Sequence, residues 1–356
     1  MNLTLYLTEN CNLRCSYCVR EKCPHDMTED TVRKSVELAF SAGDSAGICF
    51  FGGEPLLRKD LIYLALDLAQ KRSEETEKPF FAKITTNGTL IDSEFIDAAL
   101  KNKMTVGLSF DGAMQDDCRK TADGKPTSEI LIRKSKELLS RGVNTIAMGV
   151  VSPDTCGKLF ESVKLIHDLG FKSMVCNPAY GEKVTWTDEA LDELRAQYDL
   201  IVPYLKELFL QGDEFRLAPL HSKISDLLTG NDPSRYCHLG VRQLAVAYDG
   251  KLYPCTSFLH LPDWCLGSVE DGVNEERRRE MAKMCFIPEP CKDCDLKTRC
   301  TNSCGCANIL NTGSPNMISP MQCEYERMII EHADILGDQL FAAKPEAFVR
   351  SFKGRF

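Results

Sequence analysis

The spacing of three cysteines near the N-terminus constrains this sequence more than any other feature. Cys11, Cys15 and Cys18 form a CxxxCxxC pattern directly after residues 3–7, an apolar run typical of a buried strand. Three thiolates on one short loop can bind three irons of a cubane [4Fe–4S] cluster and leave the fourth iron open. A structural zinc site is the alternative, but it normally takes four protein ligands, often as two CxxC pairs.

Cysteine is abundant in a chain of otherwise ordinary composition. The 356 residues include 18 cysteines, with 27% charged and 43% hydrophobic residues. No apolar run approaches the roughly 20 residues that span a bilayer, and the N-terminus lacks the features of a secretory signal. We therefore expect a cytoplasmic protein without membrane contact, whose cysteines serve metal or redox chemistry. The net charge of −9 argues against a nucleic-acid partner.

The first half of the chain alternates apolar, β-rich runs with amphipathic stretches. Strands are expected at residues 3–7, 47–51, 80–85, 105–110, 144–151 and 172–176. Helices are expected at residues 29–41, 58–74, 92–101, 128–140 and 155–169. Six strands that alternate with helices predict a parallel sheet that is two strands short of a closed eight-unit barrel. The predicted fold class is α/β, a partial (β/α)6 barrel with a small cysteine-rich C-terminal iron–sulfur domain.

Composition changes along the chain and divides it into four predicted segments. Ten of the 18 cysteines lie between Cys237 and Cys323, where regular periodicity fades. We expect that region to be organised by metal ligation rather than by a hydrophobic core, with a closing helix at 328–341. The segments are a partial barrel at 1–185, a helical bridge at 186–235, an iron–sulfur domain at 236–330 and a helix with a tail at 331–356.

The N-terminal cysteine loop resembles that of the radical S-adenosylmethionine (radical SAM) superfamily. Tyr17 matches the aromatic residue that this family places between its last two cysteines. The resemblance implies that the open iron binds the amino and carboxylate groups of S-adenosylmethionine, whose reductive cleavage gives a 5′-deoxyadenosyl radical. It also implies an external one-electron donor of the flavodoxin or ferredoxin type.

Polar motifs follow the expected strands, at the ends where barrel enzymes hold their functional groups. The resemblance places the contact with the methionine amino group at Glu54, after two glycines that permit close backbone approach. It places ribose or methionine contacts after the fourth strand, and a basic partner of the methionine carboxylate shortly beyond. Ordinary turn formation is the alternative. The candidate cofactor-binding residues are Gly52, Gly53, Glu54, Ser109, Asp111 and Arg119.

The C-terminal cysteines follow a longer pattern, C-x12-G-x4-C, then CxxC-x5-C-x3-C and a closing cysteine. It resembles the SPASM extension, which binds two auxiliary [4Fe–4S] clusters in radical SAM enzymes acting mostly on peptides and proteins. The resemblance implies three clusters in all. One auxiliary cluster would take Cys237, Cys255 and Cys304, and the other Cys291, Cys294, Cys300 and Cys323. A fourth ligand of the first set stays open among Cys265, Cys285 and Cys306.

Two reactions fit this resemblance. The stretch 50–57, FFGGEPLL, resembles the same stretch in peptide maturases. Those enzymes crosslink ribosomally made precursors, for example through thioethers. Anaerobic sulfatase maturases, which make formylglycine, typically carry an aspartate base where this chain has Thr256, and threonine cannot act as a carboxylate base. We therefore expect a crosslinking peptide maturase first and a formylglycine-forming enzyme second. The base is left unassigned, with Asp249 and Asp263 as candidates that also suit turns.

The crosslinking interpretation requires further partners. Many such enzymes carry a leader-peptide-binding domain before the barrel, whereas this sequence begins at the first strand, so a separate leader-recognition protein is expected. A non-catalytic iron–sulfur electron carrier is a third alternative, although a carrier has no use for an open iron beside a Gly-Gly-Glu motif.

Overall fold

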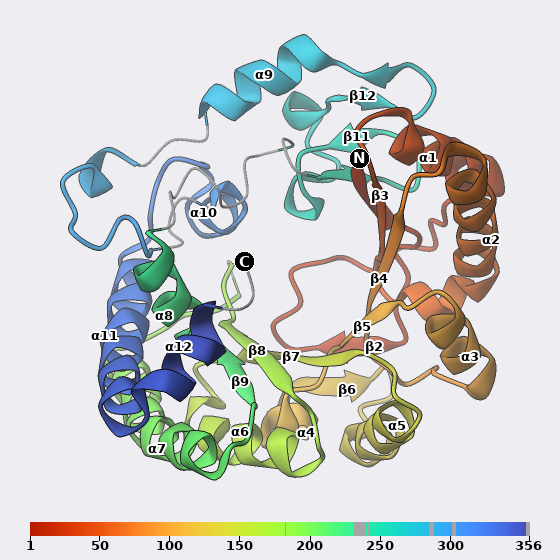
Figure 1. Ribbon diagram of the computed structural model, residues 1–356. Coiled ribbons are helices and arrows are strands. Elements are labelled where there is room, and N and C mark those ends of the chain that lie inside the picture. The colour runs from red at the N-terminus through yellow and green to blue at the C-terminus, as the bar shows by residue number, and fades with distance from the viewer. Residues whose placement is uncertain (182, 231–239, 241–242, 285–287, 301–303, 354–356) are drawn as a thin grey trace. The chain divides into compact units, whose positions relative to one another are not determined.

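The computed structural model describes residues 1–181, 183–230, 240, 243–284, 288–300 and 304–353 (Figure 1). The chain forms two compact units. The first comprises Met1–Ser109, Arg119–Thr145 and Cys237–Cys285. The second comprises Phe110–Cys118, Ile146–Tyr236 and Phe286–Phe356.

The first unit is built on a largely parallel sheet with the strand order β11-β10-β1-β3-β4-β5. All neighbours are parallel except the last pair, β10 and β11, which form an antiparallel hairpin. Inward side chains such as Leu5, Phe50 and Ile84 are fully buried, as strands covered on both faces require. The strands are β1 (Asn2–Tyr6), β3 (Ala46–Phe51), β4 (Phe80–Thr86), β5 (Thr105–Leu108), β10 (Leu244–Val246) and β11 (Leu252–Tyr253).

Helices follow the strands of this unit and cover the outer face of its sheet (Figure 1). Side-chain caps fix where two of them begin: Thr28 accepts the Thr31 N–H, and Asp92 accepts the Phe95 N–H. The helices are α1 (Glu29–Ser41), α2 (Lys59–Thr76), α3 (Ser93–Lys101), α5 (Ser128–Ser140) and α9 (Glu275–Met284). Short strand pairs complete the unit: β2 (Leu13–Cys15) with β6 (Arg119–Thr121), and β12 (Gly267–Ser268) with β13 (Gly272–Val273).

The second unit contains the parallel strands β7, β8 and β9 in that order and a group of helices. Its longest helix pair, α7 and α11, packs together, and α11 also packs on α8. The strands are β7 (Thr145–Val151), β8 (Ser173–Pro178) and β9 (Arg216–Ala218). The helices are α4 (Gln115–Cys118), α6 (Leu159–Asp168), α7 (Asp188–Gln211), α8 (Leu220–Thr229), α10 (Gly305–Thr312), α11 (Pro320–Ala343) and α12 (Pro345–Lys353).

The alternation of strands and helices in the first half matches the sequence prediction, and the mixed α/β class with parallel strands is confirmed. Strands β9 and β10 were not predicted, because three residues are too few to show a periodicity. The closing helix begins at Pro320, where Ser319 caps it, and not at residue 328.

The cysteine-rich region differs from the prediction. Residues 243–284 belong to the first unit, and Leu244, Val246, Leu252 and Phe258 are fully buried there. A hydrophobic core therefore organises this part, because β10 pairs with β1 and shares its buried face. The two units divide the 236–330 segment between them, and the four-segment division remains a prediction.

Every helix within the described parts of the chain is too short or too polar to cross a membrane.

Candidate active site

The loop that carries the first three cysteines rises from the C-terminal end of β1 and is closed at its base by backbone pairing. Thr8 and Asp26 form an antiparallel bridge, and the Met27 N–H donates to the Leu7 carbonyl at 2.8 Å. Within the loop, the Cys18 N–H donates to the Cys15 carbonyl at 3.1 Å, which makes a tight turn between these two cysteines. The fold thus presents three thiols at the strand end predicted to hold function.

Cationic and N–H donor groups surround these thiols. The Lys22 Nζ lies 2.9 Å from the Cys18 Sγ. Burial raises the pKa of Cys18, but the Lys22 hydrogen bond and the charges of Lys22 and Arg20 outweigh it and lower the pKa below its usual range. Burial raises the pKa of Cys11, which accepts the Leu13 N–H at 3.4 Å. At Cys18 the cations and donors favour the thiolate that metal ligation requires, whereas burial favours the neutral thiol at Cys11. Three thiols on one loop with a cation beside them fit a bound cluster.

The two glycines after β3 fit against the backbone of the cysteine loop. The Gly53 N–H donates to the Thr8 carbonyl and the Glu54 N–H to the Asn10 carbonyl, each at 2.8 Å. A Cβ on Gly53 would lie 2.1 Å from the Asn10 oxygen, and one on Gly52 would lie 2.5 Å from the Thr8 oxygen. The two glycines therefore permit a close approach to the loop that carries Cys11. Their role in cofactor binding stays a prediction.

Glu54 is fully buried and joins the end of β3 to the end of β4. Its carboxylate accepts hydrogen bonds from the Thr86 hydroxyl at 2.6 Å, the Asn87 N–H at 2.7 Å and the Leu56 N–H at 2.9 Å. Burial nevertheless raises the pKa of Glu54 to about 7, and these donors oppose that rise. The Glu54 side chain therefore links the chain after β3 to the end of β4.

Asn87 links Glu54 to the cysteine loop. Its side-chain nitrogen lies 3.8 Å from the Cys11 Sγ and donates to the Asn12 side-chain oxygen at 2.8 Å. The sequence analysis gave Asn87 no role and missed its contact with the thiol. A polar residue directly after a parallel strand was the available signal.

Arg119 lies next to the cysteine loop although it is far away in the sequence. It stands opposite Cys15 in the β2–β6 register, and its guanidinium carbon lies 5.4 Å from the centre of the Tyr17 ring. This is a cation–π contact, and Arg119 is almost fully buried. The structure thus brings a basic side chain to the loop, and its pairing with the methionine carboxylate stays a prediction.

The two candidates after β5 lie in different surroundings. Ser109 is half-buried in the first unit, where its N–H donates to the Thr86 carbonyl at 2.8 Å. Asp111 belongs to the second unit, where it is fully buried and accepts the Val150 N–H at 2.9 Å. That contact supports the end of β7, and a cofactor role for either residue stays a prediction.

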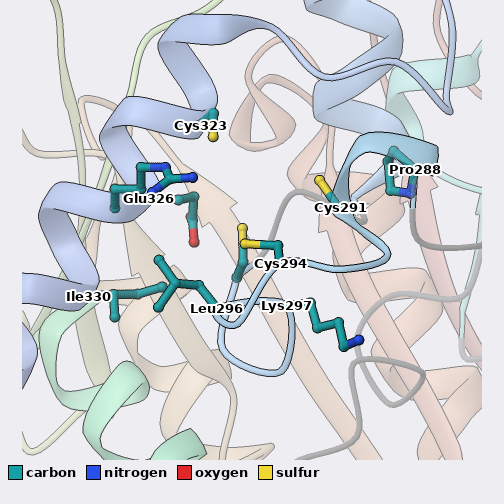
Figure 2. Close-up of a pocket in the computed structure, with 10 residues that line it drawn as sticks. Pro288, Cys291, Cys294, Leu296, Lys297, Cys323, Glu326 and Ile330 are labelled. Carbon is teal, nitrogen blue, oxygen red and sulfur yellow. The ribbon is translucent and has the colours of Figure 1, made fainter.

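Four C-terminal cysteines line one pocket in the second unit. Figure 2 shows the labelled Cys291, Cys294 and Cys323 around it, and Cys300 completes the set. Tight turns hold the loop, because the Cys294 N–H donates to the Cys291 carbonyl at 3.2 Å. Cys323 comes from the first turn of α11. The four residues predicted to act as one ligand set are therefore brought together by a loop and a helix.

A buried ionic network supports this pocket. The Lys223 Nζ on α8 donates to the Glu326 carboxylate on α11 at 2.7 Å and to the Arg299 carbonyl beside Cys300. Lys223 is 1% exposed, and Glu326 lines the pocket with the cysteines. Arg299 pairs with Asp334 of α11 at 2.6 Å. The network ties the cysteine-bearing loop to two helices.

The residues of the other predicted cysteine set lie in separate parts of the chain. Cys237 lies outside them, Cys255 follows β11 in the first unit, and Cys304 lies in the second. Of the candidate fourth ligands, Cys265 is half-buried, Cys306 is buried on α10, and Cys285 lies outside the described residues. This ligand set remains a prediction.

The candidate bases have local roles. The Asp249 carboxylate accepts the Lys251 N–H at 3.2 Å in the β10–β11 turn, and Asp263 belongs to the short helix Pro262–Trp264. Thr256 begins the short helix Thr256–Phe258, and its carbonyl accepts a hydrogen bond from the Arg20 guanidinium.

Comparison with known proteins decides the family of the first half of the chain. Residues 5–166 match the Radical SAM superfamily. This chain contains a radical SAM domain. The match begins in β1 and spans the cysteine loop and the Gly-Gly-Glu motif, and a radical SAM domain carries a [4Fe–4S] cluster.

Proteins that are similar to this chain include maturases. A cysteine-type anaerobic sulfatase-maturating enzyme of Clostridium perfringens is 26% identical, covering 83% of this chain and 86% of the relative. The solved structure of anSMEcpe with bound AdoMet has a TM-score of 0.83 at 21% identity, covering 99% of this chain and 98% of that chain. Streptococcus suis SuiB bound to its precursor peptide SuiA has a TM-score of 0.65 at 17% identity, covering 90% of this chain and 75% of that chain. These likenesses confirm the partial-barrel fold.

Proposed function

We propose that this radical SAM protein modifies a residue of a peptide or protein substrate, and that Cys11, Cys15 and Cys18 hold its initiating cluster. The proposal rests chiefly on one observation: the three-thiol loop at the end of β1 is surrounded by Lys22, the Asn87 amide and the Gly52–Gly53 turn. When bound, the cluster supplies the electron that cleaves S-adenosylmethionine to a 5′-deoxyadenosyl radical.

The surrounding residues shape the binding site for S-adenosylmethionine. Arg119, opposite Cys15, offers a cation to the methionine carboxylate. The ammonium group of the cofactor, approaching Glu54, would offset the burial that raises the pKa of that carboxyl. Ser109 and Asp111 stay candidates for the ribose or methionine part, with Asp111 the weaker one because Val150 already engages its carboxylate.

Two auxiliary clusters of the SPASM type complete the proposal. Cys291, Cys294, Cys300 and Cys323 form a full four-thiolate set, which suits electron transfer. Cys237, Cys255 and Cys304 would hold the other cluster. Anaerobic reconstitution should then give about 12 irons per chain, from three cubane clusters. A value near four irons would contradict both auxiliary sites.

Oxidative crosslinking, for example thioether formation in a ribosomally made peptide, is the proposed reaction. The absence of a carboxylate at Thr256 supports it, because formylglycine formation was expected to use a base there. Formylglycine formation is the second candidate, favoured by the similarity to the Clostridium perfringens sulfatase-maturating enzyme. The two differ in product: a crosslink removes two hydrogens and keeps the sulfur, whereas formylglycine formation from cysteine removes the sulfur.

The first experiment tests whether the protein is an enzyme at all. Reduced, reconstituted protein should produce 5′-deoxyadenosine from S-adenosylmethionine, and the Cys15→Ala variant should not. Equal product from both proteins would favour the electron-carrier alternative. Mass spectrometry of a peptide encoded beside the gene and co-expressed with this protein then separates the two reactions. Assays with flavodoxin or ferredoxin, with and without a leader-recognition protein, test the proposed partners.

A further inference from the structure

A second group of metal-ligating side chains lies at the base of the cysteine loop, apart from the three cluster cysteines. One ligand atom from each of Glu9, Cys23 and His25 lies within 4.8 Å of the other two. The sequence analysis gave none of these residues a role. We propose that Glu9, Cys23 and His25 bind one zinc ion and that His260 orients the Glu9 carboxylate from outside.

Backbone pairing places Glu9 and His25 opposite each other. Thr8 and Asp26 form an antiparallel bridge, and the Glu9 N–H donates to the His25 carbonyl at 2.9 Å. The Glu9 Oε2 consequently lies 2.7 Å from the His25 Nδ1. Cys23 precedes His25 by two residues and so joins the same cluster. The closure of the loop therefore sets the backbone positions of Glu9 and His25, and the His25 side chain is 49% exposed.

Further contacts orient these ligands. The His260 Nε2 lies 2.5 Å from the Glu9 Oε1, the carboxylate oxygen that His25 leaves free. The Tyr248 ring stacks on the His25 ring at 4.7 Å with an interplanar angle of 20°. Hydrogen bonds and packing that hold ligating side chains are a regular feature of metal sites. Glu9 itself is mostly buried, with 13% of its side chain exposed.

The chemistry of the donors selects the metal. One thiolate, one imidazole and one carboxylate form a mixed set that zinc accepts in tetrahedral geometry. Calcium and magnesium prefer oxygen ligands, and iron–sulfur clusters prefer thiolates. Three protein ligands leave one position open, as in catalytic rather than structural zinc sites. Without a metal, the same groups would form a hydrogen-bonded Glu–His pair beside an unused thiol.

The test uses cluster-reconstituted protein incubated anaerobically with zinc sulfate and then desalted. Zinc and iron per chain are measured together, and zinc X-ray absorption reports the ligands. We expect about one zinc per chain, with one sulfur at about 2.3 Å and nitrogen or oxygen ligands at about 2.0–2.2 Å. Cys23→Ser and His25→Ala should abolish this binding, and His260→Ala should weaken it by about 10–100-fold.

The matched control is Cys49→Ser, which removes a half-buried thiol from β3 and should retain zinc. Iron content reports whether each variant still folds around its clusters, and Glu9→Gln provides an independent loss of one ligand. All-sulfur zinc coordination, zinc that replaces iron, equal zinc in wild type and Cys23→Ser, or no retained zinc would each overturn the proposal.

Discussion

The side-chain nitrogen of Asn87 lies 3.8 Å from the sulfur of Cys11. The backbone N–H of the same residue donates to the buried Glu54 carboxylate at 2.7 Å. One residue at the end of β4 therefore connects the Gly-Gly-Glu turn to a proposed cluster ligand. N–H groups that point at cluster sulfurs stabilise the reduced, more negative state.

Replacing Asn87 by alanine should make the cluster harder to reduce. The variant loses an N–H donor to the Cys11 sulfur, so its reduction potential should fall by tens of millivolts, where about 59 mV corresponds to a tenfold change for one electron. A redox titration followed by electron paramagnetic resonance measures the shift. Thr89→Val is the control. The Thr89 hydroxyl donates to the Asn87 side-chain oxygen, whereas the Asn87 side-chain nitrogen, which contacts the Cys11 sulfur, is kept in this variant. An unchanged potential in Asn87→Ala would argue against the hydrogen bond.

Glu54 should make stability depend on pH. Its pKa is about 7 in the folded protein, whereas the usual value is 4.5. Between pH 4.5 and pH 7 the folded state therefore holds a proton that the unfolded state has lost. The resulting stabilisation is complete below about pH 4.5 and is lost as pH rises through about 7. The unfolding free energy of wild type relative to Glu54→Gln should therefore fall by on the order of 3 kcal/mol across that window. Urea unfolding without S-adenosylmethionine at several pH values checks this, and a constant difference would contradict it.

Gly53→Ala should displace the cysteine loop. The added methyl group would lie 2.1 Å from the Asn10 carbonyl oxygen, so the loop backbone must shift. We expect lower stability, by about 1–3 kcal/mol as for overpacking, and reduced iron content after reconstitution. Gly337→Ala is the matched control, because its Cβ would meet Ile224 at an ordinary 3.5 Å on a helix and should be neutral or stabilising. Equal iron content and stability in both variants would show that the close approach is not required.

Lys223→Met should destabilise the second unit. The substitution leaves Glu326 buried without its ionic partner, which typically costs about 3–5 kcal/mol. The double variant Lys223→Met/Glu326→Leu should recover much of that loss. Arg195→Met is the control, because its pair with Glu331 on α11 is solvent-exposed and contributes about 1 kcal/mol or less. Chemical denaturation measures all four proteins, and equal losses in the two single variants would contradict the buried-pair account.

Features that depend on neighbouring residues could be predicted from the sequence. The strand before Cys11, the helix caps at Thr28 and Asp92, and the position of Gly52–Glu54 after β3 are all set within a few residues. Periodicity and capping operate over one or two turns of chain, so a single sequence contains their signal. The same holds for the cysteine spacings, which indicated both the N-terminal loop of three cysteines and the C-terminal set of four.

The sequence by itself thus determined the alternating α/β order and which cysteines stand together on loops. Only the tertiary structure decided that Arg119 lies opposite Cys15, that Lys223 supports the four-cysteine pocket, and that Glu9, Cys23 and His25 converge. These relationships join residues distant in sequence through strand register and helix packing. Such pairings depend on how the whole chain buries its apolar faces, and no local pattern around either partner records them.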